Sequence, residues 1–409
     1  MTKPTNSKVP NIRFKGYEGE WRMKRLGEIY SERNERGNDS LQILSVSIHS
    51  GISDGELDDE SLGKQVRRSE DKSLYKHVYA GDLVLNMMRA WQGAIGVATV
   101  DGMVSPAYIT AAPDGTIDPR FMDCGLRRPQ IIAQMNNLSY GVTDFRKRLY
   151  WDSFIRVESS TPSVPEQTKI AAYFSHLDSL ITQQLRKHDK LVSLKKAMLQ
   201  KMFPQPGATT PKIRFHGFSG DWEEKKLVDI GLFYRGISYN STNVCESGLV
   251  VVRSTNIQNS RLVLNADLQF INLTCPEEIR LRKGDIAICM SNGSKALVGK
   301  SAFCEANPTS PTTVGAFCSI FRSEHPLALQ LLQTSTYSQY LYELLAGTSI
   351  NNLKNSDLRE LIFSVPTEPA EQHKVGHYFR TLDELIFRHA LQLAKLKQLK
   401  AACLEKLFV

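Results

Sequence analysis

The stretch closest to a catalytic motif is S-N-G-S-K-A-L-V-G-K-S at residues 291–301. A phosphate-binding loop needs G-x-x-x-x-G-K-[ST] between a strand and a helix, so that successive backbone amides converge on the phosphates. Here five residues separate Gly293 from Gly299, and the next residues, S-A-F-C-E-A-N-P, are typical of a strand followed by a turn. We therefore interpret the stretch as a hairpin.

Other motifs that carry catalysis are also missing from the sequence. It holds no H-E-x-x-H and no G-x-S-x-G, and the acidic run at residues 58–60 is typical of a solvated turn. An adenine methyltransferase would be expected to contain an N-P-P-[FY] loop and a Gly-rich cofactor turn, but Asn307 and Pro308 are followed by Thr309. The residues thus provide no catalytic set.

Cysteine and histidine give no metal site either. The seven cysteines have no C-x-x-C spacing, which favours buried thiols in a reducing cytosol over a zinc ribbon or a redox dithiol. His188 and His389 fall on the apolar seams of long helices, where we expect core or register residues. We predict no metal and no cofactor bound by this chain.

Composition sets the class of protein. The 409 residues are 41% hydrophobic and 23% charged, with a mean hydropathy of −0.29. These values exclude a disordered, collagen-like or integral membrane protein. No apolar run approaches 18 residues and no secretory signal is visible, so we expect a cytoplasmic protein without membrane contact. The net charge of +8 is a weak indication of a polyanionic partner.

The chain repeats itself, and the repeat must position any functional residue. Residues 10–29, P-N-I-R-F-K-G-Y-E-G-E-W-R-M-K-R-L-G-E-I, are identical at ten of twenty positions to residues 211–230. Residues 166–203 likewise match residues 371–408, from E-Q-x-K to a final Phe. Residues 30–160 and 231–362, between these ends, diverge strongly. Matching ends around different inserts indicate one scaffold that is used twice to contact two different targets.

Residues 166–203 and 371–408 are predicted to be long helices. Apolar residues recur at alternating steps of three and four from Ile170 and from Val375, which is the pattern of a coiled coil. Polar seam positions at matching register, Gln184 with His389 and Lys195 with Lys400, would help to fix the alignment. The helices carry net charges of +4 and +3, which leaves about +1 for the rest of the chain.

These features resemble the specificity subunits of type I DNA restriction–modification systems. The resemblance covers essentially the whole chain and includes I-R-F-x-G-[FY]-x-G-x-W, G-D-[LI], and V-P followed by E-Q-x-K-[IV] at the start of each long helix. It implies a mixed α/β (α+β) protein with a pseudo-two-fold internal repeat, in which two similar target recognition domains are separated by an antiparallel coiled coil. The expected segments are a first domain at 1–165, a spacer helix at 166–203, a linker at 204–210, a second domain at 211–365 and a C-terminal spacer helix at 366–409.

The resemblance also implies the function. Each domain would read one part of a bipartite, asymmetric site in double-stranded DNA, and the chain would have no enzymatic activity of its own. Two methyltransferase subunits and the restriction–translocase subunits would be its partners, and these would use S-adenosylmethionine, ATP and Mg²⁺. Two alternatives remain open: a self-contained nuclease or methyltransferase with an unrecognised site, and a coiled-coil scaffold that binds only protein.

Direct base reading needs side chains with paired donors and acceptors. In the divergent regions the candidates are Arg89, Gln92, Tyr140, Thr143, Arg146, Lys147, Arg148, Arg253, Asn256, Gln258, Asn292, Lys295, Thr348, Ser349, Asn351, Asn352 and Lys354. The candidates for docking of partners or for the spacer are Phe14, Trp21, Phe215, Trp222, Phe174, Leu177, Ile181, Phe379, Leu382 and Ile386. For the aromatic residues that open each half, docking and packing inside the domain are equally compatible with the sequence.

Overall fold

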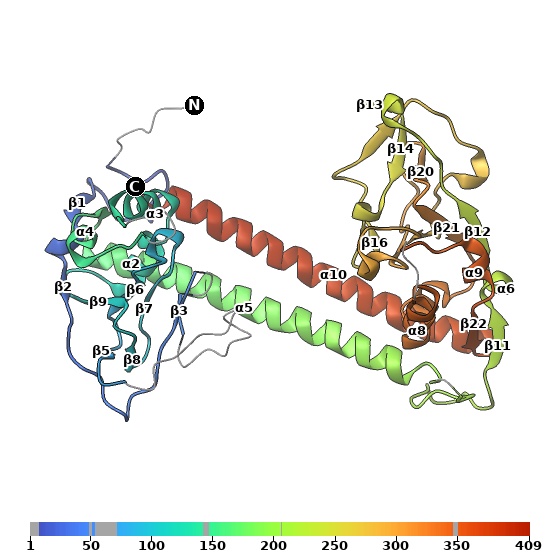
Figure 1. Ribbon diagram of the computed structural model, residues 1–409, viewed down its shortest axis with the longest axis horizontal. Coiled ribbons are helices and arrows are strands. Elements are labelled where there is room, and N and C mark those ends of the chain that lie inside the picture. The colour runs from blue at the N-terminus through green and yellow to red at the C-terminus, as the bar shows by residue number, and fades with distance from the viewer. Residues whose placement is uncertain (1–7, 49–50, 54–71, 142–146, 206, 347–350) are drawn as a thin grey trace. The chain divides into compact units, whose positions relative to one another are not determined.

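The computed structural model describes residues 8–48, 51–53, 72–141, 147–205, 207–346 and 351–409. The chain divides into two compact units. Unit 1 comprises Met1–Leu185 and Leu391–Val409, and unit 2 comprises Arg186–Ala390. Each unit therefore contains part of both long helices, α5 (Val164–Lys201) and α10 (Pro369–Lys406), which Figure 1 draws as unbroken helices.

Unit 1 is built around a four-stranded antiparallel sheet in the order β2-β9-β6-β7, accompanied by three two-stranded sheets, β1-β10, β3-β4 and β5-β8. Its strands are β1 (Arg22–Arg25), β2 (Tyr30–Glu32), β3 (Val46–Ser47), β4 (Gly51–Ile52), β5 (Lys76–Val78), β6 (Leu83–Asn86), β7 (Ile95–Val97), β8 (Gly102–Val104), β9 (Tyr108–Pro113) and β10 (Glu158–Thr161). Its shorter helices are η1 (Leu26–Glu28), η2 (Ala90–Gln92), α2 (Pro119–Leu126), α3 (Pro129–Leu138) and α4 (Trp151–Phe154).

Unit 2 contains a six-stranded sheet in the order β12-β21-β18-β19-β16-β15, a four-stranded sheet, β13-β17-β14-β20, and the pair β11-β22. Its strands are β11 (Glu223–Lys226), β12 (Leu232–Arg235), β13 (Val244–Cys245), β14 (Leu249–Val252), β15 (Ile257–Gln258), β16 (Arg261–Leu262), β17 (Gln269–Ile271), β18 (Ile286–Cys289), β19 (Ser301–Phe303), β20 (Thr312–Val314), β21 (Cys318–Arg322) and β22 (Ile362–Val365). Its shorter helices are α6 (Leu227–Ile230), η4 (Ser241–Asn243), η5 (Ser254–Asn256), η6 (Glu277–Ile279), η7 (Lys295–Leu297), α7 (Ala328–Leu331), α8 (Ser335–Leu344) and α9 (Asn355–Arg359).

The two units share a strand order that the sequence repeat explains. In unit 1 the order is β2-β9-β6-β7, and the matching strands of unit 2 follow the order β12-β21-β18-β19. The pair β1-β10 likewise corresponds to β11-β22. Unit 2 extends the common sheet by β16 and β15, in its divergent region. The repeat is therefore a repeat of framework, and the divergent residues form its additions and loops.

Each unit closes its core with an aromatic residue from the end of a long helix. In unit 1, Trp21 meets Phe408 edge to face, with ring centroids 5.9 Å apart. In unit 2, Trp222 meets Phe203 in the same way at 5.8 Å. Both tryptophans are buried. The structure thus favours domain packing for the two tryptophans, which are covered and cannot meet a partner while the units are folded.

The remaining candidates for partner docking or for the spacer are either buried or half-buried. Phe174, Leu177, Phe379 and Leu382 are buried in the cores, where Phe174 contacts Phe408. Four further candidates are half-buried: Phe14, Phe215, Ile181 and Ile386. The apolar seam is therefore used for packing where it enters each unit.

A buried ion pair ties the opening segment of each half to the start of the following long helix. Arg13 donates two hydrogen bonds to Glu166, at 2.8 and 2.7 Å, and Arg214 donates two to Glu371, both at 2.7 Å. The glutamates are 1% and 0% exposed. This pair explains why I-R-F and E-Q match between the halves, because a buried carboxylate requires a partner that can neutralise it.

The segments of α5 and α10 pack antiparallel within each unit. In unit 1, Asp178 accepts from Lys400 at 2.6 Å, and Gln184, further along α5, donates to Gln392, earlier in α10. In unit 2, Lys195 donates to Asp383 at 2.6 Å. The two lysines predicted to fix the alignment thus each bind an aspartate from the other helix. This packing, with two similar α/β units, confirms the predicted fold class.

One glycine in α10 shows how closely the helix is packed. A Cβ atom at Gly376 would lie 2.5 Å from the carbonyl oxygen of Pro326, so a side chain cannot fit there without moving backbone.

Within the described part of the chain, no helix is both long enough and apolar enough to cross a membrane.

Candidate nucleic-acid interface

In unit 1, the loop after β6 meets the segment around residues 140–148. The Leu149 amide donates to the Met87 carbonyl at 2.9 Å, and Tyr140 and Arg148 exchange two backbone hydrogen bonds, at 3.1 and 2.9 Å. The ammonium of Lys147 lies 5.9 Å from the centre of the Trp91 ring. These contacts bring together the predicted residues Arg89, Gln92, Tyr140, Lys147 and Arg148, which we call cluster 1.

Most of cluster 1 is available to a ligand. Arg89, Gln92, Tyr140 and Arg148 are exposed and Lys147 is half-buried. The ring of Tyr140 also lies tilted against that of Tyr150, with ring centroids 4.8 Å apart. An aromatic ring among three cations is a combination that nucleic-acid surfaces use, since cations bind phosphates or guanine edges and rings stack on bases. Thr143 and Arg146 lie outside the described residues.

In unit 2, the corresponding loop after β18 meets residues 351–354 in the same manner. The Leu353 amide donates to the Met290 carbonyl at 2.7 Å, and the Asn292 amide donates to Asn351 at 3.4 Å. The Asn351 side chain in turn donates to the Gly293 carbonyl at 3.2 Å. These contacts unite Asn292, Lys295, Asn351, Asn352 and Lys354, which we call cluster 2. Thr348 and Ser349 lie outside the described residues.

One lysine of cluster 2, Lys295, is held by its surroundings. Lys295 donates to the Leu345 carbonyl at 3.0 Å, and its ammonium lies 5.6 Å from the centre of the Tyr342 ring, which is 71% exposed. Lys295 lies in η7, and the chain then enters β19, which pairs antiparallel with β18. Residues 291–300 therefore form the connection of a hairpin, as the sequence predicts, and Ser301 begins a strand instead of a helix.

The three candidates after β14 behave differently from one another. Gln258 is exposed, and its amide donates to Thr255 at 2.9 Å. Arg253 forms an ion pair with the exposed Asp267 at 2.9 Å. Asn256 is only 1% exposed, and its side chain bonds the backbone of the loop from Val263 to Asp267. Asn256 therefore cannot reach a base edge, and the prediction that it reads a base is wrong. Its side chain organises the loop instead.

The two clusters present different chemistry on the same framework. Cluster 1 contains two arginines, which only donate and which match the acceptors of guanine in the major groove. Cluster 2 contains three asparagines, whose amides both donate and accept and therefore match adenine. Neither cluster contains a carboxylate. The arrangement is suited to two different readings of base edges.

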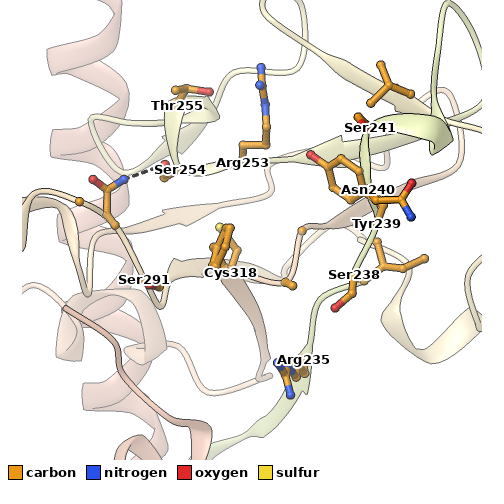
Figure 2. A pocket seen from close by; sticks show the side chains of 17 residues that line it. Arg235, Ser238, Tyr239, Asn240, Ser241, Arg253, Ser254, Thr255, Ser291 and Cys318 are labelled. Atoms are coloured by element: carbon orange, nitrogen blue, oxygen red, sulfur yellow. Dashed lines mark hydrogen bonds between the residues drawn. The ribbon is translucent and has the colours of Figure 1, made fainter. Parts of the chain in front are cut away.

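Sequence reasoning missed a cavity of about 860 Å³ beside cluster 2. In the view of Figure 2, Ser291 and Ser254 lie to one side, Tyr239 and Asn240 to the other, and Cys318 between them. The lining residues that the sequence did not single out include Arg235, Tyr239, Asn240, Ser241 and Phe317. They come from the ends of β12 and β20, distant in the sequence, so no local pattern joins them. Phe317 stands in an apolar stretch, V-G-A-F-C-S-I-F, so no sequence signal distinguished it.

The cavity is suited to binding and not to covalent chemistry. Cys318 is its one thiol, and a hydrogen bond with Cys289, together with burial, raises the pKa of Cys318. A thiol of raised pKa is a poor nucleophile at neutral pH, since the thiolate is the reactive form. No group of three His, Cys, Asp or Glu side chains that could hold a metal ion occurs among the described residues.

Comparison with known proteins gives a consistent family. The chain is 29% identical over 164 residues to the EcoKI specificity subunit of Escherichia coli (strain K12), a match that covers 38% of the chain and 34% of that protein. It is 29% identical over 171 residues to the StySPI specificity subunit of Salmonella potsdam, covering 39% and 36%. It is 23% identical over 282 residues to the MjaVIII specificity subunit of Methanocaldococcus jannaschii, covering 66% and 64%. The matches thus span about a third of the first two relatives. No family model matches the chain.

Solved structures extend the likeness to nearly the whole chain. The crystal structure of a type I restriction–modification S subunit from M. genitalium superposes with a TM-score of 0.64 at 15% identity, covering 98% of this chain and 99% of that one. A second structure, from a study of complex assembly and conformational transition of the type I R-M system, gives 0.51 at 18% identity, covering 95% and 97%. These superpositions show a shared fold. Together with the local sequence matches, they confirm the resemblance seen in the repeat: the chain is similar to type I restriction enzyme specificity subunits.

Proposed function

We propose that this chain is the DNA sequence-specificity subunit of a type I restriction–modification complex in the cytoplasm. Its two target recognition domains, residues 1–165 and 211–365, each read one part of a bipartite, asymmetric DNA site. The observation that carries the proposal is one framework with two different clusters. A repeated backbone contact, Leu149 to Met87 and Leu353 to Met290, holds each cluster in place, while the exposed side chains differ.

The electrostatics support DNA as the partner of these surfaces. Clusters 1 and 2 together carry five cations and no carboxylate. In protein–DNA complexes, contacts with phosphates set position and affinity, and contacts with base edges set the sequence. We therefore assign the arginines and lysines both roles and the asparagines and Gln92 a base-reading role.

The long helices supply surfaces for protein partners. Leu194 and Leu399 occupy matching positions of the two helices and are 38% and 45% exposed. Matching exposed leucines suit two copies of one partner, because each copy would meet the same local surface. We assign these surfaces to two methyltransferase subunits, with restriction–translocase subunits joining the same complex. S-adenosylmethionine, ATP and Mg²⁺ would be bound by those partners.

Turnover and binding measurements on the same preparations test the proposal. The chain alone, supplied with S-adenosylmethionine, ATP, Mg²⁺ and DNA, should neither methylate nor cleave. The chain with its methyltransferase subunits should bind one bipartite sequence in preference to random DNA and methylate adenines within it. Methylation or cleavage by the chain alone would identify a self-contained enzyme, and a complex without sequence preference would identify a protein-binding scaffold.

A further inference from the structure

The cavity of unit 2 has the size and the surface of a nucleobase site. At about 860 Å³ it falls within the range of pockets that hold small organic ligands. Among the lining residues, Tyr239 and Phe317 provide aromatic surface, while Asn240, Ser241 and Asn292 provide amide and hydroxyl groups. Figure 2 labels Tyr239, Asn240 and Ser241 at one side of the cavity. A nucleobase has two apolar faces and a polar edge, which match this combination of rings and polar groups.

Charge identifies the ligand further as part of a polyanion. The cavity lining contains two arginines, Arg235 and Arg253, and no carboxylate. Arg253 binds the exposed Asp267, whereas Arg235 is exposed and has no ion pair with any residue that the structure describes. Cations in the lining of an aromatic cavity suit a base that remains attached to its phosphates.

Phe317 carries an exposed side chain on a backbone that is fixed in position. It is 71% exposed, and its carbonyl accepts hydrogen bonds from the amides of Met290 at 2.8 Å and Ser291 at 3.2 Å. Two residues earlier, the Gly315 backbone packs so closely that an added Cβ would lie 3.2 Å from Val251. An aromatic side chain that faces solvent from a backbone held in this way is well suited to insert between bases and to unstack them.

Unit 1 lacks this aromatic residue. There the amide of Met87 donates to the carbonyl of Ala107 at 3.2 Å, as that of Met290 does to Phe317. Ala107 directly precedes β9 just as Phe317 directly precedes β21, so the two residues occupy equivalent places. An alanine cannot act as a wedge, and the two half-sites should therefore be treated differently.

We propose that the cavity of unit 2 binds one nucleobase of the second half-site, displaced from its stack, with Phe317 inserted where the base stood. This inference rests on the proposed function and adds a distortion confined to one half-site. The sequence preference of unit 2 then depends on how easily that step unstacks as well as on direct contacts with cluster 2.

Fluorescence of 2-aminopurine tests the proposal in the complex of this chain with its methyltransferase subunits. The probe is placed at each position of the recognised site in turn, because its emission rises when it leaves the stack. One position in the half-site of unit 2 should brighten on binding. Phe317→Ala should abolish that rise and weaken DNA binding about ten-fold, whereas Phe317→Trp should keep both. Leu232→Ala removes an exposed apolar side chain of unit 2 that lies outside the cavity, and it should leave the signal intact.

A second variant tests the cavity itself. The Asn240 side chain accepts a hydrogen bond from the Thr242 amide at 3.0 Å, and aspartate can make the same bond. Asn240→Asp therefore keeps the local structure but places a negative charge in the cavity, and it should reduce the 2-aminopurine signal. An unchanged signal in this variant would overturn the cavity as the base site. The wild-type complex could bind its site selectively and yet show no position whose 2-aminopurine emission depends on Phe317. That result would overturn the base-site proposal and leave the proposed function standing. A wild-type complex without any sequence preference would overturn both.

Discussion

Breaking the buried ion pair of one half should destabilise the protein far more than breaking an exposed pair. Glu371 is fully buried, and Arg214 binds both of its oxygens at 2.7 Å as well as the carbonyls of Gly220 and Ser219, at 2.6 and 3.1 Å. Arg214→Met leaves the carboxylate without its partner, which typically costs about 3–5 kcal/mol. In a unit of this size that corresponds to a fall of roughly 10 °C in Tm.

The double variant separates the cost of an orphaned charge from the worth of the pair. Replacing both partners, as Arg214→Met with Glu371→Leu, should recover much of the loss, because no uncompensated charge remains. The control is Lys226→Met, which breaks a 2.6 Å ion pair with Glu360. The two side chains of this pair are 48% and 66% exposed, so the variant should cost far less stability than Arg214→Met. Differential scanning calorimetry and urea unfolding measure all three variants. If Arg214→Met cost no more than Lys226→Met, or if the double variant were the least stable, the reasoning would be refuted.

Three further predictions concern pH, spacing and salt. Burial lowers the pKa of His325 to about 4, whereas the ordinary value is 6.5, so the unfolded chain takes up a proton between these values while the folded chain does not. The stability that neutral His325 contributes is therefore complete above about pH 6.5 and is lost as the pH falls toward 4. In urea titrations, His325→Gln should remove up to about 3 kcal/mol of the pH dependence of the unfolding free energy. Parallel plots of unfolding free energy against pH for the wild type and the variant would contradict this prediction. Inserting one heptad in both α5 and α10, between their ion-paired residues, adds about 10 Å and should widen the gap of the DNA site by about three base pairs, with both half-sites unchanged in methylation sequencing. Arg89→Ala should either lower the slope of log binding constant against log salt concentration by about one, or relax the preference for one base of its half-site. The control, Lys283→Ala, lies at the far end of β18 from cluster 2 and should do neither.

The sequence predicted those features that depend on local periodicity and on the repeat. The heptad pattern from Ile170 and Val375 indicated the long helices, because apolar spacing is a property of the chain itself. It selected Lys195 and Lys400 as alignment residues but not their partners. Asp383 and Asp178 became partners only through the antiparallel register, which no single helix specifies.

Part of the candidate site was also predictable, from the composition of two loops. Polar loops near residues 89 and 292 stood out from composition, and the structure adds the backbone contacts that join each loop to a segment some 60 residues later. Asn256 had a suitable side chain, but its burial depends on the path of the loop from Val263 to Asp267. The cavity was beyond sequence reasoning, because its walls come from strand ends between Arg235 and Cys318.

Each unit is proposed to read its own half of a bipartite DNA site. Sequencing of methylated adenines in cells that express this chain with its methyltransferase subunits tests it most directly, with the wild type compared with a cluster 1 variant, Arg89→Ala with Arg148→Ala, and a cluster 2 variant, Asn292→Ala with Asn352→Ala. Each variant should relax or change bases in one half of the site and leave the other half and the gap unchanged. Changes in both halves from one cluster, or an unaltered site in both variants, would contradict the account.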